Sequence, residues 1–343
     1  MSVSPPAVCP RLLDRTPPPA ASGPAGDPPS AVPQLRALLA EGTADLPAPG
    51  SGATPARWAA LARWGRTDLS LARLGEGHAD AVAILAEAGR EPVPGATYGV
   101  WAARSGGTGA VLTGGPGSWR LQGRVRFCSG AHGLDRALVV ALTADGARVA
   151  DVALDRAGVH RVPGTWETVG MARSDSVDVE LDDVPVGDDA LVGGPRWYTA
   201  RPGFWHGGAG VAAVWLGGAA GVLDDLRTAL LETDPDEHRL ALFAELHAHL
   251  AACDALLSAT ASEIDDTPAA PHRDAAWTVR AAVELACRRV LDVAPRLAGV
   301  AALTRGGPLA GRLADLGVYV RQHHGERDLA ALGAAVLATD GDR

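Results

Sequence analysis

Between residues 31 and 95, apolar residues recur every three or four positions, the period of a helix that buries one face. The recurring positions include Trp58, Leu61, Ala62, Leu69, Ala81, Ile84 and Leu85. Pro92, Pro94 and Gly95 interrupt the pattern and mark its end. The first zone is therefore predicted to be a short helical domain over residues 31–95.

The pattern changes to alternation in the zone of residues 96–190. One apolar face is formed by Trp119, Leu121, Gly123, Val125 and Phe127, and a second by Val177, Val179 and Leu181. Arginine and glutamine fill the intervening positions of the first segment, and acidic residues those of the second, as in strands with one buried face. Residues 137–142 form a short apolar run suited to a central strand. The zone is predicted to be a small antiparallel β-barrel or sandwich.

Helical spacing returns in the zone of residues 191–343. Apolar residues step by three and four through Leu240, Phe243, Leu246, Leu250, Cys253 and Leu257, and again from Val279 to Leu297. Pro235, Pro268 and Pro308 mark breaks between helices. Long helices with short connections predict a C-terminal four-helix bundle, and the whole chain is assigned to the α+β class.

Composition and charge narrow the function classes. The net charge of −9 makes nucleic acid and anionic membrane surfaces poor partners for the whole chain. The four cysteines are far apart and form no metal-binding pair, so they are expected to be reduced thiols of a cytoplasmic protein. Residues 1–30 are rich in Pro, Ala and Gly and are predicted to be a disordered tail. No histidine or cysteine spacing indicates a metal site.

One almost uncharged, glycine-rich stretch covers residues 202–223. It lacks the dominance of large aliphatic residues that a membrane span requires, so it is predicted to be a buried helix. Residues 207–222 are too apolar for an exposed helix, and this predicts a homodimer or homotetramer. Within the stretch, residues 208–213 (Gly-Ala-Gly-Val-Ala-Ala) match a dinucleotide-binding fingerprint, but no strand precedes them, so the glycines are interpreted as helix-packing positions.

Three motifs in the middle zone resemble acyl-CoA dehydrogenases. Residues 123–130 (Gly-Arg-Val-Arg-Phe-Cys-Ser-Gly) resemble the strand-ending motif of that family. Residues 168–171 (Thr-Val-Gly-Met) resemble its Leu-Gly-Met-Arg turn, and residues 176–186 resemble its following strand. Residues 302–316 loosely resemble its stretch with Gly-Gly followed by Arg-Asp. The resemblance implies a helical domain, a β-barrel and a four-helix bundle, in agreement with the changes of period.

The resemblance also implies FAD as the cofactor. Phe127 would pack on the flavin ring, Cys128 would follow it in the motif, and Ser129 would hydrogen-bond near N5 and O4 of the ring. The second flavin-covering segment would be Tyr98, Val100 and Trp101, where Trp101 either stacks on the flavin or fills a gap. Gly306 and Gly307 would approach the pyrophosphate or form a plain interhelical turn.

The carboxylate base of the family is missing from its usual place. The residue before Gly325 is His324 where the family has Glu, so the candidate bases are His324, His323 and Glu326. The histidines are alternatively a solvated helix end. Three interpretations follow: an acyl-CoA dehydrogenase with an unusual base and an acyl-CoA substrate, a flavin monooxygenase of the same fold, or an inactive binding subunit.

Overall fold

The computed structural model describes Leu13 and residues 30–305 and 307–340. The predicted tail at residues 1–30 lies almost entirely outside this part, as does Gly306. The helices are α1 (Val32–Ala40), α2 (Thr54–Thr67), α3 (Leu69–Glu87), α4 (Trp197–Ala200), α5 (Pro202–Leu231), α6 (Glu237–Asp266), α7 (Arg273–Thr304), α8 (Pro308–Tyr319) and α9 (Glu326–Asp340). The strands are β1 (Tyr98–Trp101), β2 (Ala110–Thr113), β3 (Trp119–Val125), β4 (Arg136–Thr143), β5 (Gly146–Ala153), β6 (Val159–Val162), β7 (Asp178–Val186) and β8 (Leu191–Val192).

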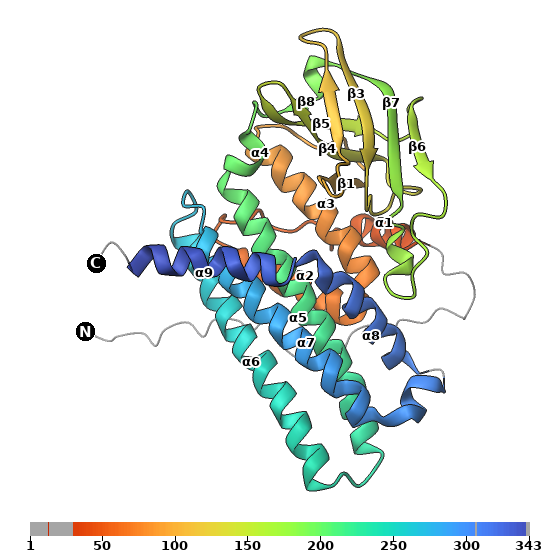
Figure 1. Cartoon of the computed structure of the whole chain (residues 1–343), viewed down its shortest axis with the longest axis vertical. Helices are drawn as coiled ribbons and strands as arrows, with labels where there is room; N and C mark the ends of the chain where they lie inside the picture. The colour runs from red at the N-terminus through yellow and green to blue at the C-terminus, as the bar shows by residue number, and fades with distance from the viewer. Residues whose placement is uncertain (1–12, 14–29, 306, 341–343) are drawn as a thin grey trace.

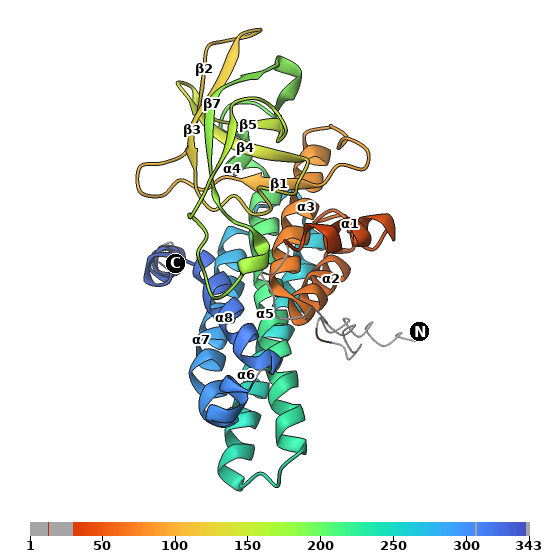
Figure 2. The same ribbon diagram turned by 90° about the vertical axis from the view of Figure 1, so that its right-hand side faces the viewer.

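The two kinds of structure occupy opposite ends of the molecule. The strands gather at one end, and α5, α6 and α7 extend side by side towards the other, with α3 and α4 between them (Figures 1 and 2). The order of helices, strands and helices along the chain confirms the α+β class. Because α3 packs against β1, α5 and α8, it links the sheet to the C-terminal helices.

The strands form one sheet in the order β6-β7-β3-β2-β4-β5-β8, with β1 also paired to β4. Five pairings are antiparallel, but β1–β4 and β2–β4 are parallel, so the expectation of a purely antiparallel barrel is wrong. The cause is β4, whose edge opposite β5 is long enough to take β1 at residues 136–139 and then β2 at residues 141–142. Among the described residues, the pairings run from β6 to β8 and do not form a closed ring.

Local sequence signals set the helix ends. Asp68 is the N-cap of α3, where its side chain accepts a hydrogen bond of 3.0 Å from the Leu71 amide. Asp236 caps α6 in the same way, accepting 2.8 Å from the Arg239 amide. The predicted break at Pro235 thus separates α5 from α6, and Pro308 begins α8.

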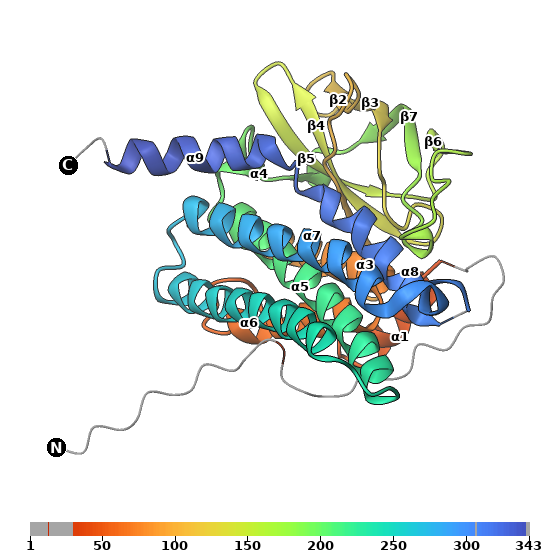
Figure 3. The same cartoon turned by 60° about the horizontal axis from the view of Figure 1, so that its bottom comes forward.

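Helix α5 is the buried helix that the glycine-rich stretch predicts. By length and composition alone, α5 and α6 could each span a membrane, but 89% of the apolar window of α5 is buried inside this chain, against 28% for α6. Helices α5 and α6 lie side by side in Figure 3. A Cβ at Gly217 would lie 2.0 Å from the carbonyl oxygen of Ala62 on α2. One at Gly210 would lie 3.0 Å from Nε1 of Trp58, so Gly210 fits the predicted packing role, whereas a Cβ at Gly208 would meet nothing within 4 Å.

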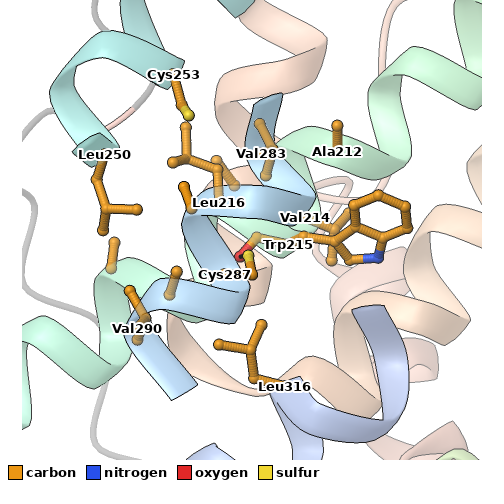
Figure 4. Close-up of a cluster of buried hydrophobic side chains, with 14 of the residues drawn as sticks. Ala212, Val214, Trp215, Leu216, Leu250, Cys253, Val283, Cys287, Val290 and Leu316 are labelled. Atoms are coloured by element: carbon orange, nitrogen blue, oxygen red, sulfur yellow. Dashed lines mark hydrogen bonds between the residues drawn. The ribbon is translucent and has the colours of Figure 1, made fainter. Parts of the chain in front are cut away.

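The core around α5 includes side chains of α6, α7 and α8. Figure 4 shows Trp215 and Leu216 of α5 among side chains of three further helices. These include Leu250 and Cys253 of α6, Val283, Cys287 and Val290 of α7, and Leu316 of α8. Since one chain buries the apolar segment 207–222, the reason for predicting a homo-oligomer disappears, and the oligomeric state itself stays a prediction.

Candidate active site

Phe127 is an exposed aromatic residue with an unusual backbone. It follows the end of β3, its φ is +58°, and its side chain is 46% exposed. The guanidinium of Arg126 lies 4.8 Å from its ring centroid, and Trp166 meets it edge-on at 6.4 Å. A left-handed conformation costs a non-glycine residue on the order of 1 kcal/mol or more, and such strain concentrates at functional sites. The exposed ring of Phe127 therefore offers a surface on which a flat ligand can stack.

A buried carboxylate on β7 holds this strand end. Asp178 is 5% exposed and accepts hydrogen bonds from Nε of Arg124, at 2.9 Å, and from the amide of Phe127, at 3.4 Å. Arg126 is also near it, with Nε 3.9 Å from its Oδ2. One carboxylate thus fixes both the backbone of Phe127 and the arginines beside it.

A glycine-rich loop lies next to Arg126. The loop between β1 and β2 contains Ser105, Gly106, Gly107 and Thr108, and Nη1 of Arg126 donates to the Ser105 hydroxyl over 3.4 Å. Both glycines have positive φ, +61° and +80°, and a Cβ added at Gly107 would meet nothing within 4 Å. Open backbone amides beside a guanidinium and hydroxyls are typical of phosphate cradles. This loop was not among the site residues predicted from the sequence, although its Gly-Gly pair flanked by Ser and Thr is a signal that could have indicated it.

The segment of Tyr98, Val100 and Trp101 lies deeper than the resemblance implies. Tyr98 is fully buried, and its hydroxyl accepts 3.0 Å from the Val93 amide. Trp101 is 2% exposed and donates from Nε1 to the Ser129 carbonyl over 3.2 Å, an arrangement in which it fills the sheet core. Val100 is half-buried. In this conformation neither ring presents a face to a ligand.

Cys128 and Ser129 also point inwards. Cys128 is fully buried, and burial raises the pKa of its thiol far above the usual value. The Ser129 hydroxyl lies 2.8 Å from that of Ser176, which lies 2.8 Å from that of Ser174. Ser174 donates to the Met171 carbonyl over 2.8 Å. The chain of hydroxyls ties the strand end to the turn before β7.

Helix α3 brings charged groups to the back of the same strand end. A Cβ at Gly130 would lie 3.1 Å from Leu74, so this turn of α3 packs directly behind the motif. Beside it, Nη1 of Arg73 lies 2.6 Å from Oε2 of Glu76, and the Tyr319 hydroxyl donates to the same oxygen over 3.3 Å. Glu76 is 4% exposed, and burial raises the pKa of its carboxyl to about 7, against the opposing effect of Arg73.

The three candidate bases have different surroundings. His323 is 4% exposed, lies edge-on to Trp215 at 6.4 Å, and accepts at Nδ1 from the Gly325 amide over 3.2 Å. Burial lowers the pKa of its imidazole, so the neutral ring carries its proton on Nε2. The His324 side chain is 60% exposed and lies 3.3 Å from Asp328. The side chain of Glu326 is 89% exposed. Only His323 of the three therefore faces the interior.

Two segments of the resemblance touch each other. The Met171 amide donates to Asp315 of α8, and a Cβ at Gly170 would lie 2.1 Å from the Ala314 carbonyl oxygen. This glycine is required because the turn after β6 presses against the α8 backbone. Gly307, at the start of α8, is exposed.

Two cavities flank these elements. One of about 280 Å³ lies between the 169–173 turn, α8 and the start of α3. The other, of about 340 Å³, is lined by Asp80, Glu87, Arg201 and His206 together with small residues. Within residues 30–305 and 307–340, no group of three His, Cys, Asp or Glu side chains could hold a metal ion.

Comparison with solved structures identifies proteins that share this fold. No protein-family model and no curated protein matches this sequence. Among solved structures, KijD3 in complex with FMN and a dTDP-amino-keto sugar is 22% identical, with a TM-score of 0.75 over 91% of this chain and 87% of that one. FMN-bound TdsC from Paenibacillus sp. A11-2 is also 22% identical, with a TM-score of 0.70 over 82% and 83%. The chain shares their fold.

A third structure gives the same result. The nitrososynthase from Micromonospora carbonacea var. africana is 19% identical, with a TM-score of 0.75 over 90% of both chains. Identities this low establish the architecture alone. The conclusion agrees with the order of helices, sheet and helices and with the contact between the 168–171 turn and α8.

Proposed function

We propose that the protein is a flavin-dependent oxidoreductase that works as a monooxygenase. The observation that carries the proposal is Phe127, an exposed ring in a left-handed conformation, stacked with Arg126 beside an open glycine-rich loop. A bound flavin would supply the redox chemistry, and the protein would supply position and electrostatics. Solved structures of this fold support the proposal, since KijD3 and TdsC were determined with FMN.

The residues around Phe127 fit both parts of a flavin. Phe127 offers its exposed face to the ring system, and the amides of Gly106 and Gly107, with Arg126, offer donors to a phosphate. This assignment needs only one phosphate, which suits FMN as well as FAD. The choice of FAD followed from the resemblance and from the motif around Phe127 and Ser129; of the two glycines expected at its pyrophosphate, Gly306 and Gly307, only Gly307 is described.

The monooxygenase interpretation is favoured over acyl-CoA desaturation by the state of the candidate bases. Desaturation requires a base within reach of the alpha proton of the thioester. The position before Gly325 holds His324, whose side chain is 60% exposed and paired with Asp328. His323, by contrast, is buried and neutral and has an Nε2 proton to donate. TdsC of the same fold is a dibenzothiophene monooxygenase.

One observation keeps desaturation as the second candidate. Glu76 is a buried carboxylate on the turn of α3 whose Leu74 packs against Gly130, and burial raises the pKa of its carboxyl to about 7, which suits a general base. An acyl-CoA substrate would then be deprotonated from α3, not from the segment after α8.

The experiment begins with flavin binding. FMN and FAD are each titrated with the purified protein, and quenching of flavin fluorescence gives the dissociation constant. Phe127→Ala is expected to weaken binding about tenfold or more, because stacking on an aromatic face contributes on the order of 1–3 kcal/mol. Val111→Ala is the control, a 42% exposed side chain on β2 of the same sheet. Equal affinities of the two variants would refute the assignment of the flavin surface.

The two candidate reactions, desaturation and monooxygenation, are then distinguished by which compound reduces or oxidises the flavin. Anaerobic bleaching of the bound flavin by acyl-CoA would support desaturation. Reaction of chemically reduced flavin with oxygen, with transfer of an oxygen atom to an added aromatic or amine substrate, would support the monooxygenase. Failure to bind either flavin would leave the inactive subunit as the remaining interpretation.

A further inference from the structure

A row of carboxylates follows one face of α3. Glu76 and Asp80 are four residues apart, which places them on the same side of the helix, and Glu87 lies three turns from Glu76. Exposure of their side chains increases along the row, from 6% at Glu76 to 22% at Asp80 and 31% at Glu87. The row therefore leads from the interior to the surface.

The inner end of the row faces α8. Leu74, on the same turn of α3, packs against Gly130 of the Phe127–Gly130 strand end, whereas Glu76, two residues further on, points to the opposite side of the helix, towards Tyr319. The Tyr319 hydroxyl donates to Glu76 Oε2 over 3.3 Å, and Tyr319 itself lies edge-on to Trp215 at 6.4 Å. Trp215 also contacts His323. Glu76 is thus the carboxylate to which the buried Tyr319 hydroxyl of α8 donates its hydrogen bond.

The outer end of the row opens into a cavity. Asp80 and Glu87 line the space of about 340 Å³ together with Arg201 and His206. Asp80 accepts 3.0 Å from Nη2 of Arg57 through Oδ1. A Cβ at Gly207 would lie 2.9 Å from Oδ2, so this glycine of α5 leaves the second oxygen room. A space of this size, lined by polar groups, can hold water.

We propose that Tyr319, Glu76 and Asp80 form a proton path from the buried side of α8, where Trp215 separates Tyr319 from His323, to this cavity. The inference rests on the proposed function, because it supplies the proton transfers of that site. When the Tyr319 oxygen takes a proton from an O–H or N–H group of a substrate, the original hydrogen of its hydroxyl passes to Glu76 Oε2. Glu76 becomes neutral and Tyr319 is restored. The proton then passes to Asp80 and to water in the cavity, and Glu76 regains its charge.

Titratable groups from five helices interact with Glu76 and affect this transfer. Asp80 on α3 raises the pKa of the Glu76 carboxyl, while Arg73 on α3 and Arg57 on α2 lower it, and burial has the largest effect. The remaining groups that interact with it are Tyr319 on α8, Arg280 on α7 and Tyr198 on α4. The resulting pKa of about 7 allows Glu76 both to accept and to release a proton at neutral pH.

The first test needs no flavin. The protein is labelled with carboxyl-¹³C glutamate, and the Glu76 resonance is identified by its loss in Glu76→Gln. The path predicts a titration midpoint about 7. Asp80→Asn is expected to lower this midpoint by removing a neighbouring negative charge, and Tyr319→Phe to raise it by removing a donor to the carboxylate. Glu91→Gln, on an exposed loop, is the control and should leave the midpoint unchanged.

The second test uses the flavin-loaded protein. The rate of oxygen transfer to an added substrate that carries an O–H or N–H group is measured from pH 5 to pH 9 by stopped flow. Wild type and Glu91→Gln should show an inflection of this rate near pH 7 that Glu76→Gln lacks. At pH 7 the rate of Glu76→Gln should be about tenfold lower than that of wild type, with an unchanged dissociation constant for flavin.

The outcomes separate the two proposals. A Glu76 midpoint near 4.5, or one that Asp80→Asn leaves unchanged, overturns the path even if flavin binds. An inflection that persists in Glu76→Gln does the same, and the proposed function then stands alone. If no flavin binds, the proposed function fails, and the path through this site fails with it whatever the midpoint of Glu76.

Discussion

Two glycines of α5 give a matched test of the helix packing that positions the site. A Cβ at Gly217 would lie 2.0 Å from the Ala62 carbonyl oxygen and 2.9 Å from the Ala62 Cα, both backbone atoms of α2. Ordinary contact begins at about 3.4 Å, so α2 and α5 must move apart by about 1 Å or more at this point. Gly208, on the same helix, has nothing within 4 Å of an added Cβ.

The magnitudes follow from these contacts. Replacing a helical glycine by alanine contributes about 1 kcal/mol of stability where the methyl group fits. Overpacking a close-packed core costs about 1–3 kcal/mol, and more where backbone must move. Gly217→Ala is therefore expected to be destabilised by about 2 kcal/mol or more, and Gly208→Ala to be unchanged or slightly more stable. For a chain of 343 residues, a loss of about 2 kcal/mol corresponds to a decrease in Tm of roughly 3 °C.

The assay is thermal and urea unfolding of both variants beside wild type, followed by circular dichroism. The order of stability should be Gly208→Ala, wild type, Gly217→Ala. Equal Tm values for the two variants would refute the close approach of α2 and α5. Because α2 and α5 both pack against α3, Gly217→Ala should also weaken flavin binding, whereas Gly208→Ala should not.

Four further predictions concern single groups. Asp178→Asn should weaken flavin binding about tenfold in a fluorescence titration, because Asp178 holds the Phe127 amide and Arg124. The folded-state pKa of Glu76, about 7, is above its unfolded value, so the protonated carboxyl contributes its full stability at low pH, and this contribution is lost as pH rises through 7. Between pH 5.5 and pH 8, the free energy of unfolding of Glu76→Gln in urea should therefore increase by roughly 2 kcal/mol relative to that of wild type. Cys128, Cys253 and Cys287 are buried with raised thiol pKa values, so mass spectrometry should find them unalkylated by iodoacetamide until the protein unfolds. His323→Ala should slow turnover of bound flavin by roughly 10²–10⁴ and His324→Ala should not, and the reverse order in stopped-flow measurements would restore His324 as the acting residue.

Sequence periodicity alone determined the order of helix and strand zones. The three-and-four spacing around Leu61 and around Leu250 lies in α2 and α6, and the alternation from Trp119 lies in β3. Period reports which face of an element is buried, so it identifies the element and its inward side. It also identified α5 as a buried helix, because a long run without charge and with many glycines is stable only inside a protein.

Sequence could not decide which elements pair or meet. The parallel partners of β4 depend on how the loop between β1 and β2 places both strands along one edge, and side-chain alternation is the same in parallel and antiparallel strands. The apolar face of α5 predicted a partner subunit, but the partners are α2, α3, α6, α7 and α8 of the same chain. An apolar helix face must be buried against other apolar side chains, but the sequence pattern does not specify whether these belong to the same chain or to a second subunit.

The site shows the same division. The motif around Phe127 was visible in the sequence, because local residues set the strand end and its strained turn. Burial of His323 and exposure of His324 depend on the turn after α8, which adjacent positions in the sequence do not distinguish. Glu76 lies 243 positions from Tyr319, and only the packing of α3 against α8 brings the two together and removes the carboxyl from water. The pKa of Glu76 is therefore a property of the tertiary structure, since it depends on desolvation and on charges from other helices.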